Sequence, residues 1–169
     1  MKLHQLIIIF FFGIGINAKG QTINVTGGDW NPSTPVIVVA GDTYSNNGVL
    51  ESITSQSTIT VSGNGNGNGN GNGNGNNPWR ITVNKVDINW DNRLIVKVKR
   101  IGGSGNPNNN GQGMNGGLVY QVVQNTPSLF FNGNGSWSLI NVQYELSGIS
   151  VAIPAGTYQT EVVYTVSAQ

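Results

Sequence analysis

Short runs of alternating apolar and polar residues recur along this chain, and clusters of Gly, Asn and Pro separate them. The runs are rich in Val, Ile, Thr and Tyr, and beyond the first 20 residues none has a convincing helical period. Short strands divided by turn residues at this spacing are typical of a β-sandwich or a β-barrel. The pattern therefore predicts an all-β, antiparallel fold.

The predicted strands cover most of the chain outside two loops rich in Gly and Asn. They are Thr22–Thr26, Pro35–Ala40, Val49–Ile53, Ser57–Ser62, Trp79–Val83, Val86–Trp90, Leu94–Ile101, Leu118–Gln124, Ser136–Leu146, Ile149–Ile153 and Thr157–Val166. Pro35–Ala40 is apolar on both faces, so we expect it in the middle of a sheet. Asp91–Arg93 is expected to form the hairpin turn between the strands on either side of it.

The alternation in Leu94–Ile101 predicts which side chains enter the core. Successive residues of a strand face opposite sides of the sheet. Val96 and Val98 should therefore point inward together with Leu94, and Lys97 and Lys99 should point outward.

A change of alternation predicts an irregularity near Lys85. Trp79 and Val83 belong to an odd-numbered apolar row, whereas the apolar residues from Val86 onward fall on even numbers. A β-bulge shifts the alternation in this way. We therefore expect two strands with a bulge or corner at Lys85.

The first 20 residues have the organisation of a secretory signal peptide. A basic start precedes an apolar stretch from Leu6 to Ile16, and small residues follow at Ala18 and Gly20. These 11 apolar residues are too few to cross a bilayer, which needs about 20. We expect cleavage after Gly20, a mature chain of residues 21–169 with no membrane span, and a secreted protein located outside the cell at its surface.

The composition of the mature chain excludes several classes of protein. Loss of Lys2, His4 and Lys19 leaves six basic against seven acidic residues, too little positive charge for a nucleic-acid-binding surface. The chain has no Cys, so it has no disulfide, no zinc–thiolate site and no thiol nucleophile. Asp29 and Asp42 could offer oxygen ligands to calcium, but they lack the spacing of a dedicated calcium loop. The length fits one domain.

The residues also offer no convincing catalytic set. Without His or Cys, the mature chain lacks the common general base and the common nucleophile pairs. Asp87 and Asp91 could act as the two carboxylates of a glycosidase. Lys85 and Arg93 lie beside them in sequence, so a solvated, charged hairpin is the better interpretation. We predict a protein that is not an enzyme and has no cofactor.

A repeat of alternating Gly and Asn fills residues 63–77 and ends at Pro78. Both residue types tolerate positive φ and add no apolar burial, so the repeat is expected to be a disordered tether or a long hairpin loop. Stacked Asn ladders or contact with a surface are the functional alternatives. A second Gly/Asn-rich loop is expected at residues 102–117.

All basic residues of the mature chain lie in one stretch. They are Arg80, Lys85, Arg93, Lys97, Lys99 and Arg100. They indicate either a patch for an acidic polysaccharide or a partner subunit, or an exposed sheet face on which Lys protects an edge strand. Under the first interpretation, Lys97, Lys99 and Arg100 are the candidate surface-binding residues.

The four Trp residues could stack on sugars. Trp79, Trp90 and Trp137 lie in or beside strands with an apolar pattern, which favours the core. Trp30 lies in the loop "GGDWNPSTP", so we expect it to be exposed and add it to the candidate surface-binding residues.

The C-terminal third carries the most specific motifs. "INVQYELSGISVAIPAGTYQTEVVYTV", Ile140 to Val166, resembles the end of secreted bacterial fimbrial subunits of the chaperone–usher and spore-coat-U type. In those proteins a Pro-Ala-Gly-Thr-Tyr turn, here Pro154 to Tyr158, precedes an alternating last strand. "WSL" at Trp137–Leu139 is similar to a WxL-type cell-wall-binding domain, which is the second candidate.

The fimbrial resemblance implies an immunoglobulin-like β-sandwich that lacks one strand. Each subunit would then lend an N-terminal strand to its neighbour, after a periplasmic chaperone has held it. Gln21–Thr26 would be the donor, with Ile23 and Val25 filling pockets. The same segment could equally be the first strand of its own sheet.

These observations lead to two hypotheses of function. The first is a non-catalytic, fimbria-like or surface-layer subunit that assembles with copies of itself or with related subunits by β-strand association, with an adhesive role open. The second is a monomeric module that binds a glycan or the cell wall through Trp30 and the Lys97–Arg100 strip.

Overall fold

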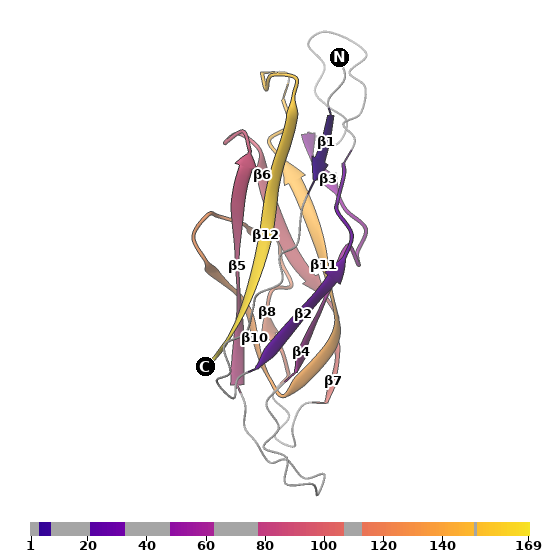
Figure 1. Cartoon of the computed structure of the whole chain (residues 1–169). Coiled ribbons are helices and arrows are strands. Elements are labelled where there is room, and N and C mark those ends of the chain that lie inside the picture. The colour runs from indigo at the N-terminus through magenta and orange to yellow at the C-terminus, as the bar shows by residue number, and fades with distance from the viewer. Residues whose placement is uncertain (1–3, 8–20, 33–47, 63–77, 107–112, 151) are drawn as a thin grey trace, which may run out of the picture.

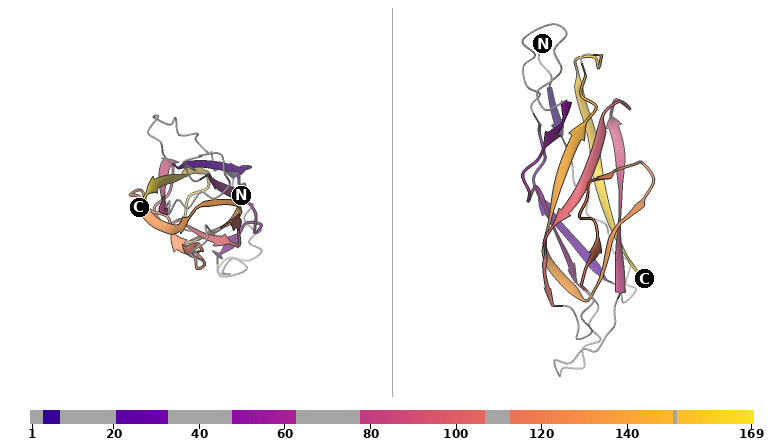
Figure 2. Two further views of the ribbon diagram at one scale, coloured as in Figure 1. Left: turned by 90° about the horizontal axis from the view of Figure 1, so that it is seen from below. Right: turned by 180° about the vertical axis from the view of Figure 1, so that it is seen from behind.

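The computed structural model describes most of the chain as two β-sheets. The described residues are 4–7, 21–32, 48–62, 78–106, 113–150 and 152–169. Within these ranges every regular element that spans more than one residue is a β-strand (Figure 1). The two sheets lie face to face, as the view along the long axis shows (Figure 2). The prediction of an all-β, antiparallel sandwich is thereby confirmed.

The first sheet, sheet A, has five strands. In spatial order they are β1 (His4–Ile7), β12 (Thr157–Ala168), β5 (Pro78–Asn89), β10 (Ser128–Asn134) and β8 (Asn115–Gly116). The pairs β12–β5, β5–β10 and β10–β8 are antiparallel, whereas β1 runs parallel to β12.

The second sheet, sheet B, has seven strands around the long strand β11. Its main path is β2 (Thr22–Gly27), β4 (Ser57–Ser62), β11 (Ser136–Ser147), β6 (Ile95–Ile101) and β9 (Gln121–Val122). Two short strands, β3 (Leu50–Glu51) and β7 (Ser104–Asn106), also pair with β11. All pairs in sheet B are antiparallel.

The core lies between the sheets and follows the strand alternation. Apolar side chains that are fully buried come from β4, β5, β6 and β11: Ile59, Val61, Trp79, Ile81, Val83, Val96, Val98, Ile140, Val142 and Tyr144. Val96 and Val98 point inward as the sequence predicted, and Lys97 and Lys99 lie on the outer face. Burial of these apolar side chains is the main driving force for holding the two sheets together.

A chain of hydroxyl groups crosses the middle of the core. Tyr144 in sheet B exchanges a hydrogen bond of 2.9 Å with Ser57, and Tyr164 in sheet A donates to the Tyr144 hydroxyl at 3.1 Å. Burial raises the pKa of Tyr144 to about 12, so its hydroxyl stays neutral at ordinary pH. Buried polar groups that are paired in this way do not carry the cost of an unmade hydrogen bond, and they fix how the sheets face each other.

The expected corner at Lys85 is wrong, because β5 is one strand from Pro78 to Asn89. Its register with β12 shifts only later, between the pairs Thr160–Asp87 and Gln159–Asn89. Lys85 and Asp87 therefore continue the inward row of apolar residues. The apolar residues on even numbers, such as Val86, are exposed instead.

Strand β10 is absent from the sequence prediction, and several predicted strands are shorter than expected. Phe130 and Phe131 of β10 are buried, but Asn and Gly around them hide the strand pattern. The predicted strand Leu118–Gln124 is reduced to β9, and Val49–Ile53 to β3. The predicted strand at residues 149–153 is not a strand in its described part. That part forms a turn, in which the Ile153 side chain is buried.

The two Gly/Asn-rich loops have different outcomes. The predicted loop at residues 102–117 contains the short strands β7 and β8. The repeat at residues 63–77 lies outside the described residues, and so does the predicted central strand Pro35–Ala40.

Candidate functional site

The candidate assembly strand Gln21–Thr26 forms most of β2 at one edge of sheet B. It pairs along its whole length with β4 of the same chain, from Thr22–Ser62 to Gly27–Ser57. Ile23 and Val25 are half-buried and pack against the core. The sequence left open whether this segment pairs with a neighbouring subunit or within its own chain. In the structure it is the first strand of its own sheet.

The last strand, β12, forms the corresponding edge of sheet A. Within the described residues only β5 and β1 pair with it, and β1 covers only its beginning, from His4–Thr157 to Ile7–Gln159. The strand is 12 residues long and contains no Lys, Arg, Pro or Gly, and its single charge is Glu161. Natural edge strands are usually protected by such residues. Within the described residues, the outer edge of β12 therefore has a partner only along its beginning and lacks such protecting residues.

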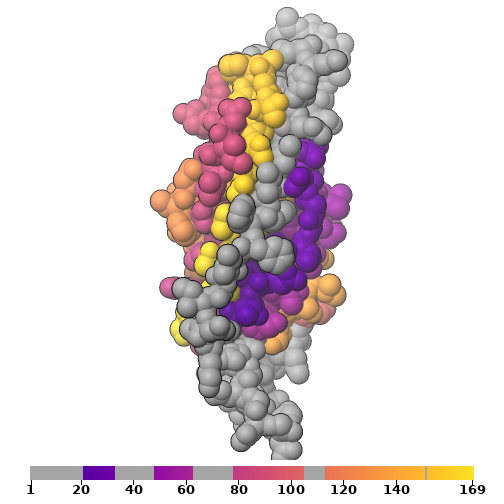
Figure 3. Space-filling model, in the orientation of Figure 1, coloured from indigo at the N-terminus to yellow at the C-terminus, as the bar shows by residue number. Residues whose placement is uncertain are grey.

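The two edges lie on the same side of the sandwich. β2 contacts β12, and the space-filling view shows both strands on one face of the molecule (Figure 3). An extended segment that pairs with β12 would therefore also approach β2.

Trp30 is buried, in contrast to the expectation that it is exposed. Its indole is 7% exposed and stacks on Tyr144 with ring centroids 6.1 Å apart. The residue follows β2 directly, and its side chain folds back into the core. Trp30 therefore belongs to the packing of the sandwich and cannot stack on a ligand at the surface.

Lys97 and Lys99 lie on the outer face of β6, and each has a partner. The Lys97 ammonium donates to the Glu145 carboxylate at 2.6 Å on the neighbouring strand β11. The Lys99 ammonium lies 4.2 Å from the centroid of the Tyr120 ring. Ion pairs and cation–π contacts at the surface stabilise the fold only weakly.

Arg100 is not part of this outer surface, so the predicted strip of three surface residues is wrong. Its side chain shares the inward direction of Val98 and is buried. The guanidinium donates to the Gly116 carbonyl at 2.6 Å and the Met114 carbonyl at 3.4 Å, and it lies over the Phe131 ring. Burial lowers the pKa of Arg100, and the two carbonyls accept hydrogen bonds from its Nε and Nη2 atoms.

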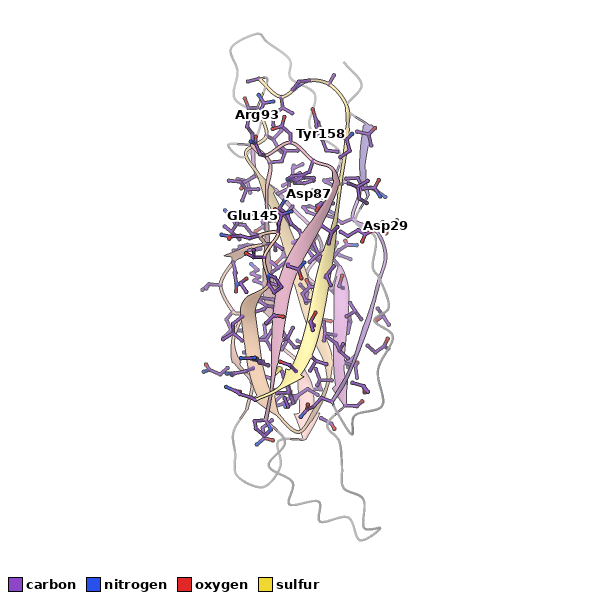
Figure 4. All side chains as sticks on the ribbon, turned by 60° about the vertical axis from the view of Figure 1, so that its left-hand side comes forward. Asp29, Asp87, Arg93, Glu145 and Tyr158 are labelled. Carbon is purple, nitrogen blue, oxygen red and sulfur yellow. The ribbon has the colours of Figure 1, made fainter. Side chains whose placement is uncertain are left out.

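The two carboxylates considered for catalysis are both held by neighbouring cations. The Asp91 carboxylate accepts hydrogen bonds from the Arg93 side chain and backbone, which lower its pKa to about 2. Burial raises the pKa of Asp87, but hydrogen bonds from Lys85, Asn125 and Thr160 outweigh it and leave the pKa below its ordinary value. Figure 4 shows Asp87 and Arg93 toward the same end of the sandwich. A glycosidase acid needs a raised pKa, and neither group has one.

The described ranges also lack two other kinds of functional feature. They hold no group of three or more His, Asp or Glu residues close enough to bind a metal ion. No helix in this part of the chain is long and apolar enough to cross a membrane.

The short motifs behind the resemblances take defined conformations. In "WSL", the Trp137 indole donates to the Asn134 carbonyl at 2.8 Å. Leu139 lies at a bulge in β11 with a left-handed φ of 53° and is exposed. In the Pro-Ala-Gly-Thr-Tyr segment, the Tyr158 hydroxyl donates to the Pro154 carbonyl at 2.6 Å and closes the turn before β12.

Comparison of the chain with protein-family models, with curated proteins and with solved structures finds no match.

Proposed function

We propose that this chain is a non-catalytic structural protein of a bacterial cell surface, with an immunoglobulin-like sandwich. Its copies associate by β-strand addition, and the assembly can serve adhesion. The observation that carries the proposal is the outer edge of β12, which is long and unprotected within the described residues and which pairs with an added parallel strand, β1.

Export would open this edge. β1 consists of residues 4–7, which belong to the predicted signal peptide. Cleavage after Gly20 removes β1 and leaves the beginning of β12, Thr157 to Gln159, without its outer partner. The unpaired N–H and C=O groups of such an edge are a template for an extended segment from another chain.

The proposed donor is the β2 segment, Gln21–Gly27, of a neighbouring copy. After cleavage it is the N-terminus of the chain, and among the described strands only β4 pairs with it. When the segment leaves β4 and pairs with β12 of another copy, backbone hydrogen bonds to β12 replace those that it made to β4. An open β12 edge also favours aggregation, so the proposal includes a periplasmic chaperone that covers it before assembly.

The alternative hypothesis, a module that binds a glycan or the cell wall, depended on Trp30 and the Lys97–Arg100 strip as an exposed binding surface. Trp30 and Arg100 are buried, and Lys97 is engaged by Glu145. Trp30 and the Lys97–Arg100 strip therefore do not support this alternative.

The test measures the mass of the purified mature chain, residues 21–169, by light scattering and on denaturing gels with and without boiling. We expect oligomers that appear as a ladder in the unboiled sample and collapse to one band after boiling. A variant that lacks residues 21–27 should stay monomeric and should bind a synthetic peptide of residues 21–27.

The matched control is the same peptide with Ile23→Asp and Val25→Asp, which should not bind. Because both residues also pack against their own core, the unfolding midpoint of the deletion variant is measured to show that it is folded. A mature chain that remains monomeric at every concentration, or a deletion variant that still assembles, would overturn the proposal.

A further inference from the structure

A cavity opens between the sheets where the inward row of β5 changes from apolar to charged. It has a volume of about 450 Å³ and lies between the end of β5, the start of β6 and the segment that follows β9. Lys85, Asp87, Trp90, Ile95, Val122 and Asn125 are among its lining residues. Sites for small molecules have volumes of roughly 300–1,000 Å³ and combine apolar walls with a few polar groups.

The polar side of this cleft is held rigidly. The Lys85 ammonium is 2.5 Å from an Asp87 carboxylate oxygen, and their side chains are 11% and 31% exposed. Asn125 and the buried Thr160 each donate to the same carboxylate at 2.9 Å. Lys85 donates to both carboxylate oxygens, so each oxygen of Asp87 accepts two hydrogen bonds, and Asp87 is fixed in position and ionised.

The apolar side is formed by Trp90 and by aliphatic side chains. The Trp90 indole N–H donates to the Leu94 carbonyl at 2.9 Å, which fixes the ring, and Lys85 lies 5.6 Å from the ring centroid. Ile95 and Val122 remain 39% and 44% exposed beside it. An aromatic face next to exposed aliphatic groups and fixed hydrogen-bonding groups is typical of a binding site and unusual for a closed core.

The charges of the cleft indicate the chemistry of its ligand. The ammonium of Lys85 and the carboxylate of Asp87 neutralise each other, so the lining carries no net charge. The exposed residues Asn92, Gln124 and Asn125 add amide donors and acceptors. A net-neutral site of this kind gives a charged ligand no net attraction, and an alkyl ligand would displace water from the exposed amides without replacing their hydrogen bonds.

We propose that this cleft binds a neutral saccharide unit. The C–H face of one sugar ring packs on Trp90, and its hydroxyl groups exchange hydrogen bonds with the exposed amides of Gln124 and Asn125, the second of which Asp87 holds in place. Such a site gives the surface protein an adhesive function that does not depend on strand association. It also places sugar recognition at Trp90, whereas the sequence suggested Trp30.

The experiment titrates the purified protein by calorimetry and tryptophan fluorescence with neutral sugars. The probes are methyl glycosides of glucose, galactose, mannose and N-acetylglucosamine, together with lactose and cellobiose. Glucuronic acid is the charged comparison. We expect saturable binding of at least one neutral sugar, little affected by salt, and weaker binding of the acid.

Two variants and a matched control locate the site. Trp90→Phe should weaken binding by about tenfold and Asn125→Ala by about fivefold. Trp137 is the control, because it is also half-buried and its indole N–H also donates to a backbone carbonyl, but it lies at the opposite end of the sandwich. Trp137→Phe should leave the affinity unchanged. Thermal unfolding shows that each variant is folded.

Three outcomes would overturn the proposal. They are the absence of saturable binding to every neutral probe, salt-sensitive binding of glucuronic acid alone, and a loss of affinity in Trp137→Phe that Trp90→Phe does not show.

Discussion

The inward-facing rows of β5 in sheet A and β6 in sheet B both end in charged residues, at opposite ends of the sandwich. The charged residue is enclosed at one end and lines a cleft at the other. On β6, Arg100 follows Val98 and is buried. On β5, Lys85 and Asp87 follow Val83 and line an open cleft. The same alternation thus produces a closed end and an open end.

The closed end is filled because other segments fit closely around Arg100. Gly117 approaches so near that a Cβ atom there would lie 3.2 Å from the Arg100 Cγ atom. Gly133 allows a similar approach to Trp79, whose ring atoms would lie 2.5 Å from an added Cβ. No equivalent glycine contact surrounds Lys85 within the described ranges. Close packing against a glycine therefore accompanies the enclosed charge at Arg100, and the described ranges show no such packing at Lys85.

The largest expected difference is in the free energy of unfolding lost when the Trp residue at each end is replaced by Ala. Trp79 is fully buried and donates to the Gly135 carbonyl at 2.7 Å, so Trp79→Ala should lower the free energy of unfolding by about 4 kcal/mol. Trp90 is half-buried beside the cleft, so Trp90→Ala should cost about 2 kcal/mol. Urea denaturation measures both. Equal losses would mean that the two ends are packed alike, and Trp79→Phe serves if Trp79→Ala does not fold.

Replacing the charged residue at the closed end should likewise lower the free energy of unfolding more than replacing the one at the open end. Arg100→Met leaves two carbonyls without their donor inside the protein and should cost about 2 kcal/mol. Lys85→Met leaves Asp87 with Asn125, Thr160 and water from the cleft, and should cost about 1 kcal/mol. The same denaturation experiment compares them. A larger loss for Lys85→Met would show that the cleft end is the more tightly closed one.

Gly117→Ala tests the close approach directly. The residue has a φ of +73°, and an added Cβ would meet Arg100 and the Phe130 ring at 3.2–3.3 Å. The left-handed backbone and the contact together should cost roughly 1–2 kcal/mol. Gly113→Ala is the matched control, because no described atom lies within 4 Å of its added Cβ and its φ is not positive. Thermal unfolding should separate the two variants, and an unchanged midpoint for Gly117→Ala would contradict this account.

The smallest expected effect is a dependence of the stability of the fold on acidic pH, which arises from the carboxyl groups at the open end. A carboxyl group whose pKa is lower in the folded state stabilises the fold above its ordinary pKa of 3.8, and this contribution is lost as pH falls. For Asp91 the loss extends from about pH 4 to about pH 2. Asp87→Asn should therefore flatten the decline of the unfolding midpoint below pH 4. If Asp87→Asn keeps the full decline, the Asp87 network is not its source.

The places where sequence reasoning failed have physical causes. Trp30 lies between Gly28 and Pro32 and carries no strand pattern, so only its stack on Tyr144, more than 100 residues away, reveals that it is buried. The charge of Arg100 predicts a surface position, although the residue is even-numbered like Val96 and Val98 and therefore shares their face of the strand. Strand β10 was missed because Asn and Gly surround its two Phe residues. For Arg100 and β10, residue type outweighed strand position, and for Trp30 only a long-range contact reveals the burial.

The sequence by itself determined the fold class and the direction of most strand side chains. These properties are local, since alternation with a period of two assigns each residue to a face. Only the tertiary structure decided which strands pair, that β2 belongs to its own sheet and that, within the described residues, β12 is covered on its outer side only along its beginning. It also decided that Arg100 is enclosed while Lys85 and Asp87 face a cleft. Those outcomes depend on contacts between residues far apart in the chain, and no local pattern encodes them.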